Sequence, residues 1–185
     1  MHGLVSLLPA PYYEEVKLIW KELRETYGLR GIEITPFPHF SWQIAENYDF
    51  TELGFIMQEV CTRTAPIKVR TSGLGIFTGP KPVIFIPVIK NNSLTKVHKD
   101  IWNLALDYST GLSNLYHPDL WMPHISLAYE DVDPRIVGQI TGALADKDLI
   151  WEMNIDNLAL IYEPTGNIGK LMYEYKFRDQ EDTIP

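Results

Sequence analysis

The sequence predicts an α+β fold with two pseudo-symmetric lobes, each a mainly antiparallel sheet with flanking helices, and a cleft between the lobes. Short segments rich in β-branched and aromatic residues, separated by Gly and Pro, alternate with segments of helical periodicity. A repeat also divides the chain, because Pro38-His39-Phe40-Ser41 matches Pro123-His124-Ile125-Ser126. Two copies of one unit indicate two lobes of similar plan rather than a solenoid.

The segments of the first lobe follow from helical periodicity and helix capping. Ile19 and Leu23 belong to an apolar face with helical spacing, which predicts a helix over residues 11–27. Asp49 and Glu52 stand at the spacing of a capping box and predict a second helix that ends near residue 64. A strand is expected before each helix, at residues 3–8 and 36–45.

The rest of the chain alternates strands with two further helices. Ser93 is expected to cap a helix that ends near residue 109. Asp133 followed by Pro134 is typical of a helix start, and that helix is expected to end near residue 147. The β-branched and aromatic segments predict strands over residues 66–70, 74–77, 82–89, 120–129, 149–162 and 170–177.

The overall composition is ordinary for a soluble protein. Hydrophobic residues make up 45% and charged residues 22% of the 185 residues, and no apolar run approaches the ~20 residues that a membrane-spanning helix needs. The one cysteine, Cys61, excludes an internal disulfide and fits a reducing compartment; its apolar helical surroundings predict a buried, inert thiol. We therefore expect a cytoplasmic monomer with a single bilobal domain over residues 1–178 and a polar tail over 179–185.

The charge balance limits the partners that the protein can bind. The formal net charge of −8 argues against an extended nucleic-acid surface, because Lys and Arg hold phosphate backbones. A small nucleotide or an RNA terminus in a local pocket remains compatible with this charge. No His, Cys and Asp residues have zinc-site spacing, so we expect no metal and no cofactor.

The two His-x-Ser motifs carry the strongest indication of chemistry. Residues i and i+2 of a strand point to the same face, so His39 lies beside Ser41, and His124 beside Ser126. If the two strands lie side by side, two imidazoles and two hydroxyls surround one cavity. One imidazole can accept a proton while the other donates one, and the hydroxyls can bind phosphoryl oxygens.

The paired motifs resemble those of the 2H phosphoesterase superfamily, which includes bacterial 2′-5′ RNA ligase-like proteins and 2′,3′-cyclic nucleotide phosphodiesterases. The resemblance covers nearly the whole chain, and the segment Gly73–Phe77 is also similar to the middle region of that family. It implies catalytic roles for the residues of the two motifs: His39, Ser41, His124 and Ser126. The family pattern has Thr more often than Ser, and both motifs here retain the hydroxyl.

The resemblance implies hydrolysis of a 2′,3′-cyclic phosphate or a related 2′-5′ phosphodiester without a metal ion. One histidine activates water and the other protonates the leaving ribose oxygen; we expect His124 to be the base and His39 the acid. Two alternatives remain open, namely a 2′-5′ RNA ligase and a non-catalytic protein that binds nucleotides or RNA ends. Two titrating groups favour an enzyme, since binding alone does not require them.

Residues outside the motifs have weaker indications. Gln43 shares the face of His39 if the strand stays regular, so it is a candidate substrate-binding residue, although an edge position outside the pocket fits equally. Tyr12 could stack on a base, or it could be a boundary aromatic of the first helix. His98 is expected at a surface or boundary position of its helix, and His117-Pro118-Asp119 is interpreted as a turn.

Overall fold

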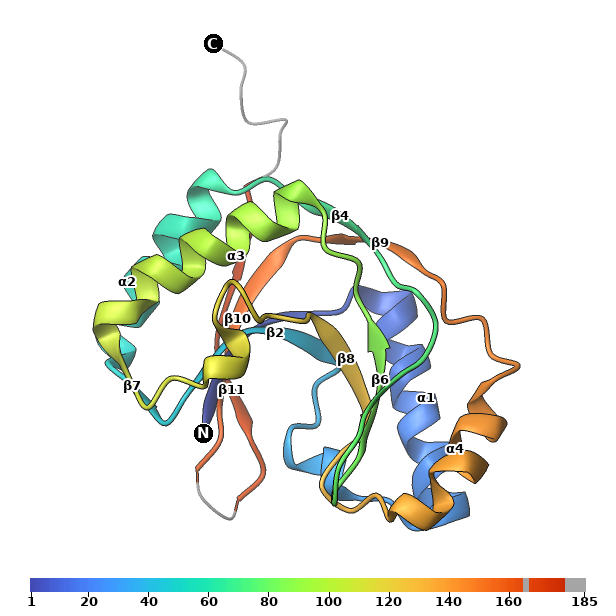
Figure 1. The fold of residues 1–185 in the computed structure, drawn as a ribbon. Coiled ribbons are helices and arrows are strands. Elements are labelled where there is room, and N and C mark those ends of the chain that lie inside the picture. The colour runs from blue at the N-terminus through green and yellow to red at the C-terminus, as the bar shows by residue number, and fades with distance from the viewer. Residues whose placement is uncertain (165–166, 179–185) are drawn as a thin grey trace.

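Two antiparallel sheets meet at the centre of the computed structural model, which describes residues 1–164 and 167–178 (Figure 1). The first sheet, in the order β11–β10–β1–β2, contains β1 (His2–Leu7), β2 (His39–Ala45), β10 (Asn157–Tyr162) and β11 (Lys170–Lys176). The second, in the order β5–β6–β8, contains β5 (Gly75–Phe77), β6 (Val83–Pro87) and β8 (His124–Ala128). The edge strands β2 and β8 contact each other between the sheets.

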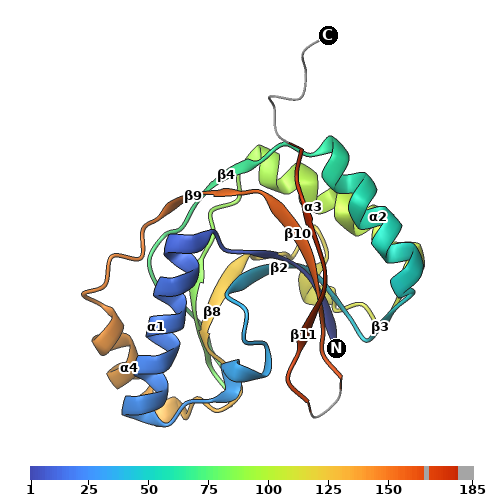
Figure 2. The ribbon, with the colours of Figure 1, turned by 180° about the vertical axis from the view of Figure 1, so that it is seen from behind.

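The helices cover the two sheets from opposite sides of this junction. Figure 2 shows α2 and α3 together on one side and α1 with α4 on the other. Their bounds are α1 (Ala10–Tyr27), α2 (Phe50–Arg63), α3 (Asn92–Ala105) and α4 (Val137–Leu144). Helix α1 follows β1 in the chain but packs on β8, whereas α3 follows β6 but packs on β2. This exchange of helices joins the lobes.

Shorter elements connect the main ones. Two-stranded ladders pair β4 (Ile67–Arg70) with β9 (Glu152–Ile155) and β3 (Asn47–Tyr48) with β7 (Ser109–Thr110). The short 3-10 helices are η1 (Gly31–Ile34), η2 (Leu106–Tyr108), η3 (Asn114–Tyr116) and η4 (Pro134–Ile136). Helix η3 lies in the segment that leads to β8 and contacts β2. The connection before β8 is therefore itself part of the central junction.

One hydrophobic core extends through both lobes. Phe40 and Ile125, the middle residues of the two motifs, are 1% and 0% exposed, so each motif strand is anchored by its central side chain. Trp42 and Trp121 are fully buried beside them, with ring centroids 5.5 Å apart. These buried rings hold the motif strands in place, because packed aromatic surface contributes strongly to core stability.

The predicted α+β fold with two lobes is confirmed, while several boundaries differ. Asn91 rather than Ser93 caps α3, since its side chain accepts a hydrogen bond from Leu94 N–H at 2.8 Å. The segment expected as one strand over 149–162 forms β9 and β10, and Asp133 begins η4, a 3-10 turn that precedes α4. The predicted tail, 179–185, lies outside the described residues. In the part of the chain that is described, no helix is long and apolar enough to cross a membrane.

The predicted cap of α2 offers a test of local stability. Asp49 accepts hydrogen bonds from the N–H groups of Thr51 at 3.1 Å and Glu52 at 3.2 Å. We predict that Asp49→Ala lowers the free energy of unfolding by about 1 kcal/mol, as loss of an N-cap typically does. Urea denaturation would measure this loss. Asp49→Asn is the matched control and should stay close to wild type; equal losses in both variants would contradict the capping role.

Candidate active site

The structure brings the two His-x-Ser motifs to adjacent strands. His39 and Ser41 lie on β2, and His124 and Ser126 lie on β8; all four side chains are partly exposed, whereas the residue between each pair is buried. The two strands contact each other, and His124 is close enough to His39 to act on its titration electrostatically. The predicted alternation of partly exposed and buried residues is therefore present in each motif, and the two histidines lie near each other.

A β-bulge follows the serine of each motif at the same position. In β2, Val5 of β1 lies opposite Ser41 and the next pair skips Trp42; in β8, Phe85 of β6 lies opposite Ser126 and the next pair skips Leu127. A bulge bends its strand and changes which side chains share a face. Because both bulges follow the serine, the sequence repeat is also a repeat of backbone structure.

The backbone carbonyl of each serine accepts a hydrogen bond from a tryptophan that lies outside the serine's own strand. The indole Nε1–H of Trp121 donates to Ser41 O at 2.9 Å, and that of Trp20 on α1 donates to Ser126 O at 3.0 Å. These carbonyls border the bulges, where the regular ladder is interrupted. The two indoles satisfy them and fix both serines relative to the core.

Backbone contacts set the orientation of both catalytic-candidate rings. Nδ1 of His39 hydrogen-bonds to Phe37 O, and Nδ1 of His124 hydrogen-bonds to Met122 O at 2.7 Å. A carbonyl oxygen only accepts, so Nδ1 must carry the proton in each neutral ring. Nε2 of each ring is then an acceptor in the neutral form and a donor in the protonated form. Both rings offer the same nitrogen to a substrate.

Burial favours the neutral form of both rings in the free protein. It lowers the pKa of His39 to about 4; the bond to Phe37 O opposes this change, and the nearby His124 adds to it. Burial also lowers the pKa of His124 below its ordinary value of 6.5, against the opposing effect of the Met122 carbonyl. A low-dielectric surrounding disfavours the charged imidazolium and therefore lowers the pKa of each ring. An anion between the rings would attract the imidazolium charge and raise both pKa values.

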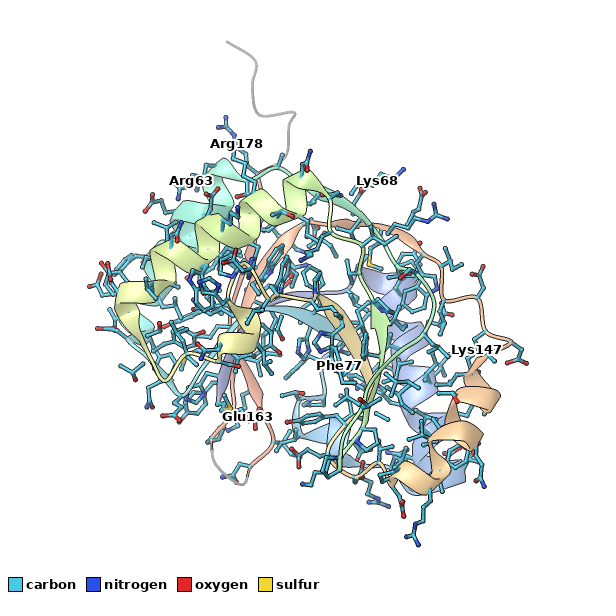
Figure 3. The ribbon with its side chains drawn as sticks, viewed as in Figure 1. Arg63, Lys68, Phe77, Lys147, Glu163 and Arg178 are labelled. Carbon is cyan, nitrogen blue, oxygen red and sulfur yellow. The ribbon has the colours of Figure 1, made fainter. Side chains whose placement is uncertain are left out.

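Two phenylalanines border His124, and the sequence did not single them out. The ring centroids of Phe77 and Phe85 lie 5.0 and 5.1 Å from that of His124, and the two phenyl rings stack at 4.1 Å. Gly75 provides the necessary space, because a Cβ there would lie 2.5 Å from a ring carbon of Phe85. Figure 3 shows Phe77 near the middle of the molecule, at the junction of the lobes. These rings form an apolar wall beside one catalytic candidate.

Gln43 does not share the face of the motif as the regular strand predicted. Its side chain is 0% exposed, and its Oε1 accepts a hydrogen bond from the hydroxyl of Tyr48 at 3.1 Å. The bulge at Trp42 shifts the alternation by one residue, so Trp42 and Gln43 are both buried and Ile44 is the next partly exposed residue. Sequence alone gave no sign of this shift.

Tyr12 contacts β9 rather than the motif residues. Its hydroxyl donates to Glu152 O at 2.7 Å, and its ring lies 5.1 Å from that of Trp151. Within the described part of the chain, its contacts are those of a boundary aromatic at the start of α1. Cys61 is 2% exposed and burial raises the pKa of its thiol to about 12, which confirms the predicted buried thiol.

His98 is buried, contrary to the predicted surface or boundary position. It is 1% exposed and stacks on Trp121, with ring centroids 3.8 Å apart and planes inclined by 5°. Its Nε2 lies 3.0 Å from Trp42 O, at the bulge of β2. The polar ring is accommodated because α3 packs on β2, where a backbone carbonyl freed by the bulge faces it. His98 therefore packs behind β2 and contacts residues that adjoin Ser41.

Three of the described cations, Arg63, Lys68 and Lys147, lie away from the paired motifs (Figure 3). Figure 3 shows Arg63 and Lys68 at one end of the molecule and Lys147 at another edge, far from Phe77. Arg63 and Lys68 border a cavity of about 840 Å³ between α2 and α3, which none of the motif residues line. Both are paired with carboxylates, Arg63 with Glu59 and Lys68 with Glu152. This cavity is therefore separate from the two His-x-Ser motifs.

The arrangement suits a group that is compact and anionic. The two imidazoles lie close enough to affect each other, each has a serine two residues away on its own strand, and an apolar wall borders His124. Residues of these types can transfer protons at a phosphoryl group and bind its oxygens. Among the described residues, no three or more His, Cys, Asp or Glu side chains are grouped so that they could hold a metal ion. The candidate site thus consists of titrating rings and neutral hydrogen-bond donors.

This fold and this pair of motifs define a class of protein, and sequence comparison confirms it. A model of the 2′-5′ RNA ligase superfamily matches residues 14–167, so the chain belongs to that superfamily, the 2H phosphoesterases. A search among curated proteins found no match.

Solved structures share the fold at low sequence identity. TT0787 of Thermus thermophilus matches with a TM-score of 0.63 and 15% identity, over 97% of this chain and 98% of that one. E. coli LigT, solved with 3′-AMP, matches with a TM-score of 0.58 and 13% identity, over 95% and 97% of the two chains. A further structure, described as a phosphoesterase, matches with a TM-score of 0.60 and 13% identity, over 95% of this chain and 97% of that one.

Titration of the rings tests the electrostatics of the site. We predict that His39 titrates with a pKa of about 4 and His124 below 6.5, and that saturating inorganic phosphate raises both pKa values, because an anion favours the imidazolium. NMR chemical shifts of the ring Cε1–H groups, assigned with single His→Gln variants, would measure this. Ordinary pKa values that do not respond to phosphate would contradict the described surroundings.

Proposed function

We propose that the protein is a phosphodiesterase that hydrolyses 2′,3′-cyclic phosphate, or a related 2′-5′ phosphodiester, at RNA ends or in small nucleotides. The observation that supports it most is the matched pair His39 and His124, each tied through Nδ1 to the carbonyl two residues before it. Binding alone would not need two rings with equivalent free Nε2 atoms. LigT, which shares the fold, was solved with 3′-AMP, ATP and NADP+, which supports a small nucleotide as ligand.

The proposed reaction uses one ring to remove a proton and the other to supply one. Water attacks phosphorus while its proton passes to Nε2 of a neutral histidine. The bond from phosphorus to one ribose oxygen breaks, and that oxygen takes the proton from Nε2 of the protonated histidine. The hydroxyls of Ser41 and Ser126 donate to non-bridging phosphoryl oxygens, whose charge increases in the transition state. A phosphomonoester and a free ribose hydroxyl result.

We assign His124 as base and His39 as acid. Because the pKa of His39 in the free protein is lowered to about 4, its protonated form would be a strong proton donor, and a neutral His124 would accept the proton of water. The cost of protonating His39 is offset when the anionic phosphate binds, since the charges attract. We further propose that the reaction needs no metal ion. The protein is proposed to be monomeric and to act in the cytoplasm.

Removing either ring should abolish turnover. We predict that His39→Ala and His124→Ala each lower kcat for 2′,3′-cyclic AMP at least about a hundredfold, as loss of a general acid or base does. Chromatography of the products in EDTA would measure it. His117→Ala, which removes a half-exposed imidazole, is the control and should retain turnover. Wild-type rates in either motif variant would exclude the two-histidine mechanism.

The same assay separates the alternatives. Formation of a phosphomonoester in chelator supports hydrolysis, whereas joining of a 2′,3′-cyclic phosphate end to a 5′-hydroxyl end supports a ligase. Binding without any chemical change would support the non-catalytic alternative and contradict the proposal.

The pH dependence of kcat/KM gives an independent prediction. This quantity reports the free protein, which must hold one neutral and one protonated ring. Both pKa values are lowered from 6.5, so the competent form decreases as the pH rises through the higher of the two lowered values. We predict that kcat/KM is maximal below pH 6.5 and falls above it. A steady-state profile from pH 4 to 9 that keeps rising above pH 7 would contradict this.

A further inference from the structure

His124 differs from His39 in having two aromatic rings packed against it. The ring of Phe77 is nearly perpendicular to that of His124, with centroids 5.0 Å apart and planes inclined by 87°, and the ring of Phe85 lies 5.1 Å away at 60°. Among the described residues, no aromatic ring packs against His39 in this way, although Nδ1 of both histidines contacts a backbone carbonyl. The two imidazoles therefore share a backbone contact but differ in their side-chain surroundings.

Strand pairing places both phenyl rings on the same face of the sheet as His124. Phe85 of β6 lies opposite Gly75 of β5 and opposite Ser126 of β8. Phe77 follows Gly75 by two residues, and His124 precedes Ser126 by two residues in a regular part of the ladder. Residues that lie opposite each other, or two apart in one strand, share a face. Three neighbouring strands thus bring the phenyl rings and the imidazole together.

Phe85 and Gly75 hold the ring of Phe77 in place. Phe85 is 3% exposed, so its ring is a buried surface on which the partly exposed ring of Phe77 stacks, with centroids 4.1 Å apart. Gly75 leaves the space that the Phe85 ring occupies, since a Cβ at this position would lie 2.5 Å from one of the ring carbons. The contact between Phe77 and His124 therefore rests on a buried base.

One hydrogen bond does not fix the plane of an imidazole. The bond from Nδ1–H of His124 to Met122 O, 2.7 Å long, selects which edge of the ring faces the backbone. The ring can still turn about the Cβ–Cγ bond, because a torsion between a tetrahedral and a planar carbon has broad minima. Close-packed rings at 60° and 87° to the imidazole oppose such a turn sterically. Phe77 and Phe85 therefore supply the restraint that the hydrogen bond lacks.

We propose that Phe77, supported by Phe85 and Gly75, is a positioning residue that acts through His124: it holds the imidazole in the plane in which Nδ1–H meets Met122 O and Nε2 is left for the substrate. The kinetic part of this inference rests on the proposed function. Proton transfer needs Nε2 at a defined place, and a displacement of about 1 Å can lower a rate about a hundredfold. Phe77 thus contributes to turnover without reacting itself.

Removing the ring of Phe77 tests this role by kinetics and by NMR. We expect Phe77→Leu to lower kcat for 2′,3′-cyclic AMP about tenfold and to change KM less than about twofold, because placement of the base is lost rather than binding. At about pH 8, where imidazoles are neutral, long-range 1H–15N correlation spectra should show His124 as the Nδ1–H tautomer in wild type and as a mixture with the Nε2–H tautomer in the variant. Phe77→Met serves the same test if the leucine variant does not fold.

The chain offers two controls for this experiment. Phe50→Leu removes a phenyl ring that packs against the imidazole of His2, with centroids 5.4 Å apart and planes inclined by 69°. It should leave both kcat and the tautomer of His124 unchanged. The tautomer of His39 is an internal control, which should stay the same in every variant because Phe77 acts on His124 alone.

The readouts keep this inference separate from the proposed function. If wild type hydrolyses the cyclic nucleotide, an unchanged kcat or an unchanged tautomer of His124 in Phe77→Leu excludes the role, and a raised KM alone would show that Phe77 contacts the substrate instead. An equal change at His39 would also overturn it, because the effect would then be general. If wild type does not hydrolyse the nucleotide, the proposed function fails and the tautomers decide: a mixture at His124 only supports the positioning role, and an unchanged ring overturns it.

Discussion

The site depends on the contact between β2 and β8, edge strands of two different sheets that do not pair with each other. Since no backbone ladder joins the two strands, side-chain contacts must fix their relative position. Trp121, which precedes β8, donates to Ser41 O on β2, and Trp20 of α1 donates to Ser126 O on β8. Buried indole hydrogen bonds of this kind are costly to leave unmade, so they restrict the relative position of the two strands.

The bulges explain why carbonyls are available for these contacts. Each bulge interrupts the ladder directly after the serine, and carbonyls next to it turn toward other donors. The same irregularity interrupts the alternation of buried and partly exposed residues directly after each serine. A regular strand would continue the polar face along Gln43, and the site would be less confined. The confinement of each motif to one His-Ser pair is thus a consequence of backbone geometry.

Burial at this junction also sets the charge state. Desolvation outweighs the carbonyl contacts that favour the imidazolium, so the pKa of each imidazole is lowered and its neutral form is favoured in the free protein. The chain has a net charge of −8, so the anion must be attracted by local groups rather than by the overall field. Two kinds of local group can attract the anion. The serine hydroxyls are neutral hydrogen-bond donors, and the imidazole rings become easier to protonate when an anion lies beside them.

The sequence predicted those features that follow from local pattern. Strand periodicity placed each histidine beside its serine, the repeat predicted two lobes, and Asp49 marked the start of α2. Residues placed by tertiary structure could not be found in this way. Phe77 and Phe85 reach His124 through strand pairing, and Gln43 left the predicted face because a bulge has no clear local signal. His98 looked like a boundary residue because the carbonyls that it meets belong to distant segments.

A crystal structure with inorganic phosphate or 2′-AMP bound tests the central claim most directly. The account predicts one phosphoryl group between the two strands, with Nε2 of His39 and Nε2 of His124 each about 3 Å from a phosphoryl oxygen or the ribose oxygen attached to it. A phosphoryl group that contacts only one of these rings, or that binds elsewhere on the protein, would contradict it.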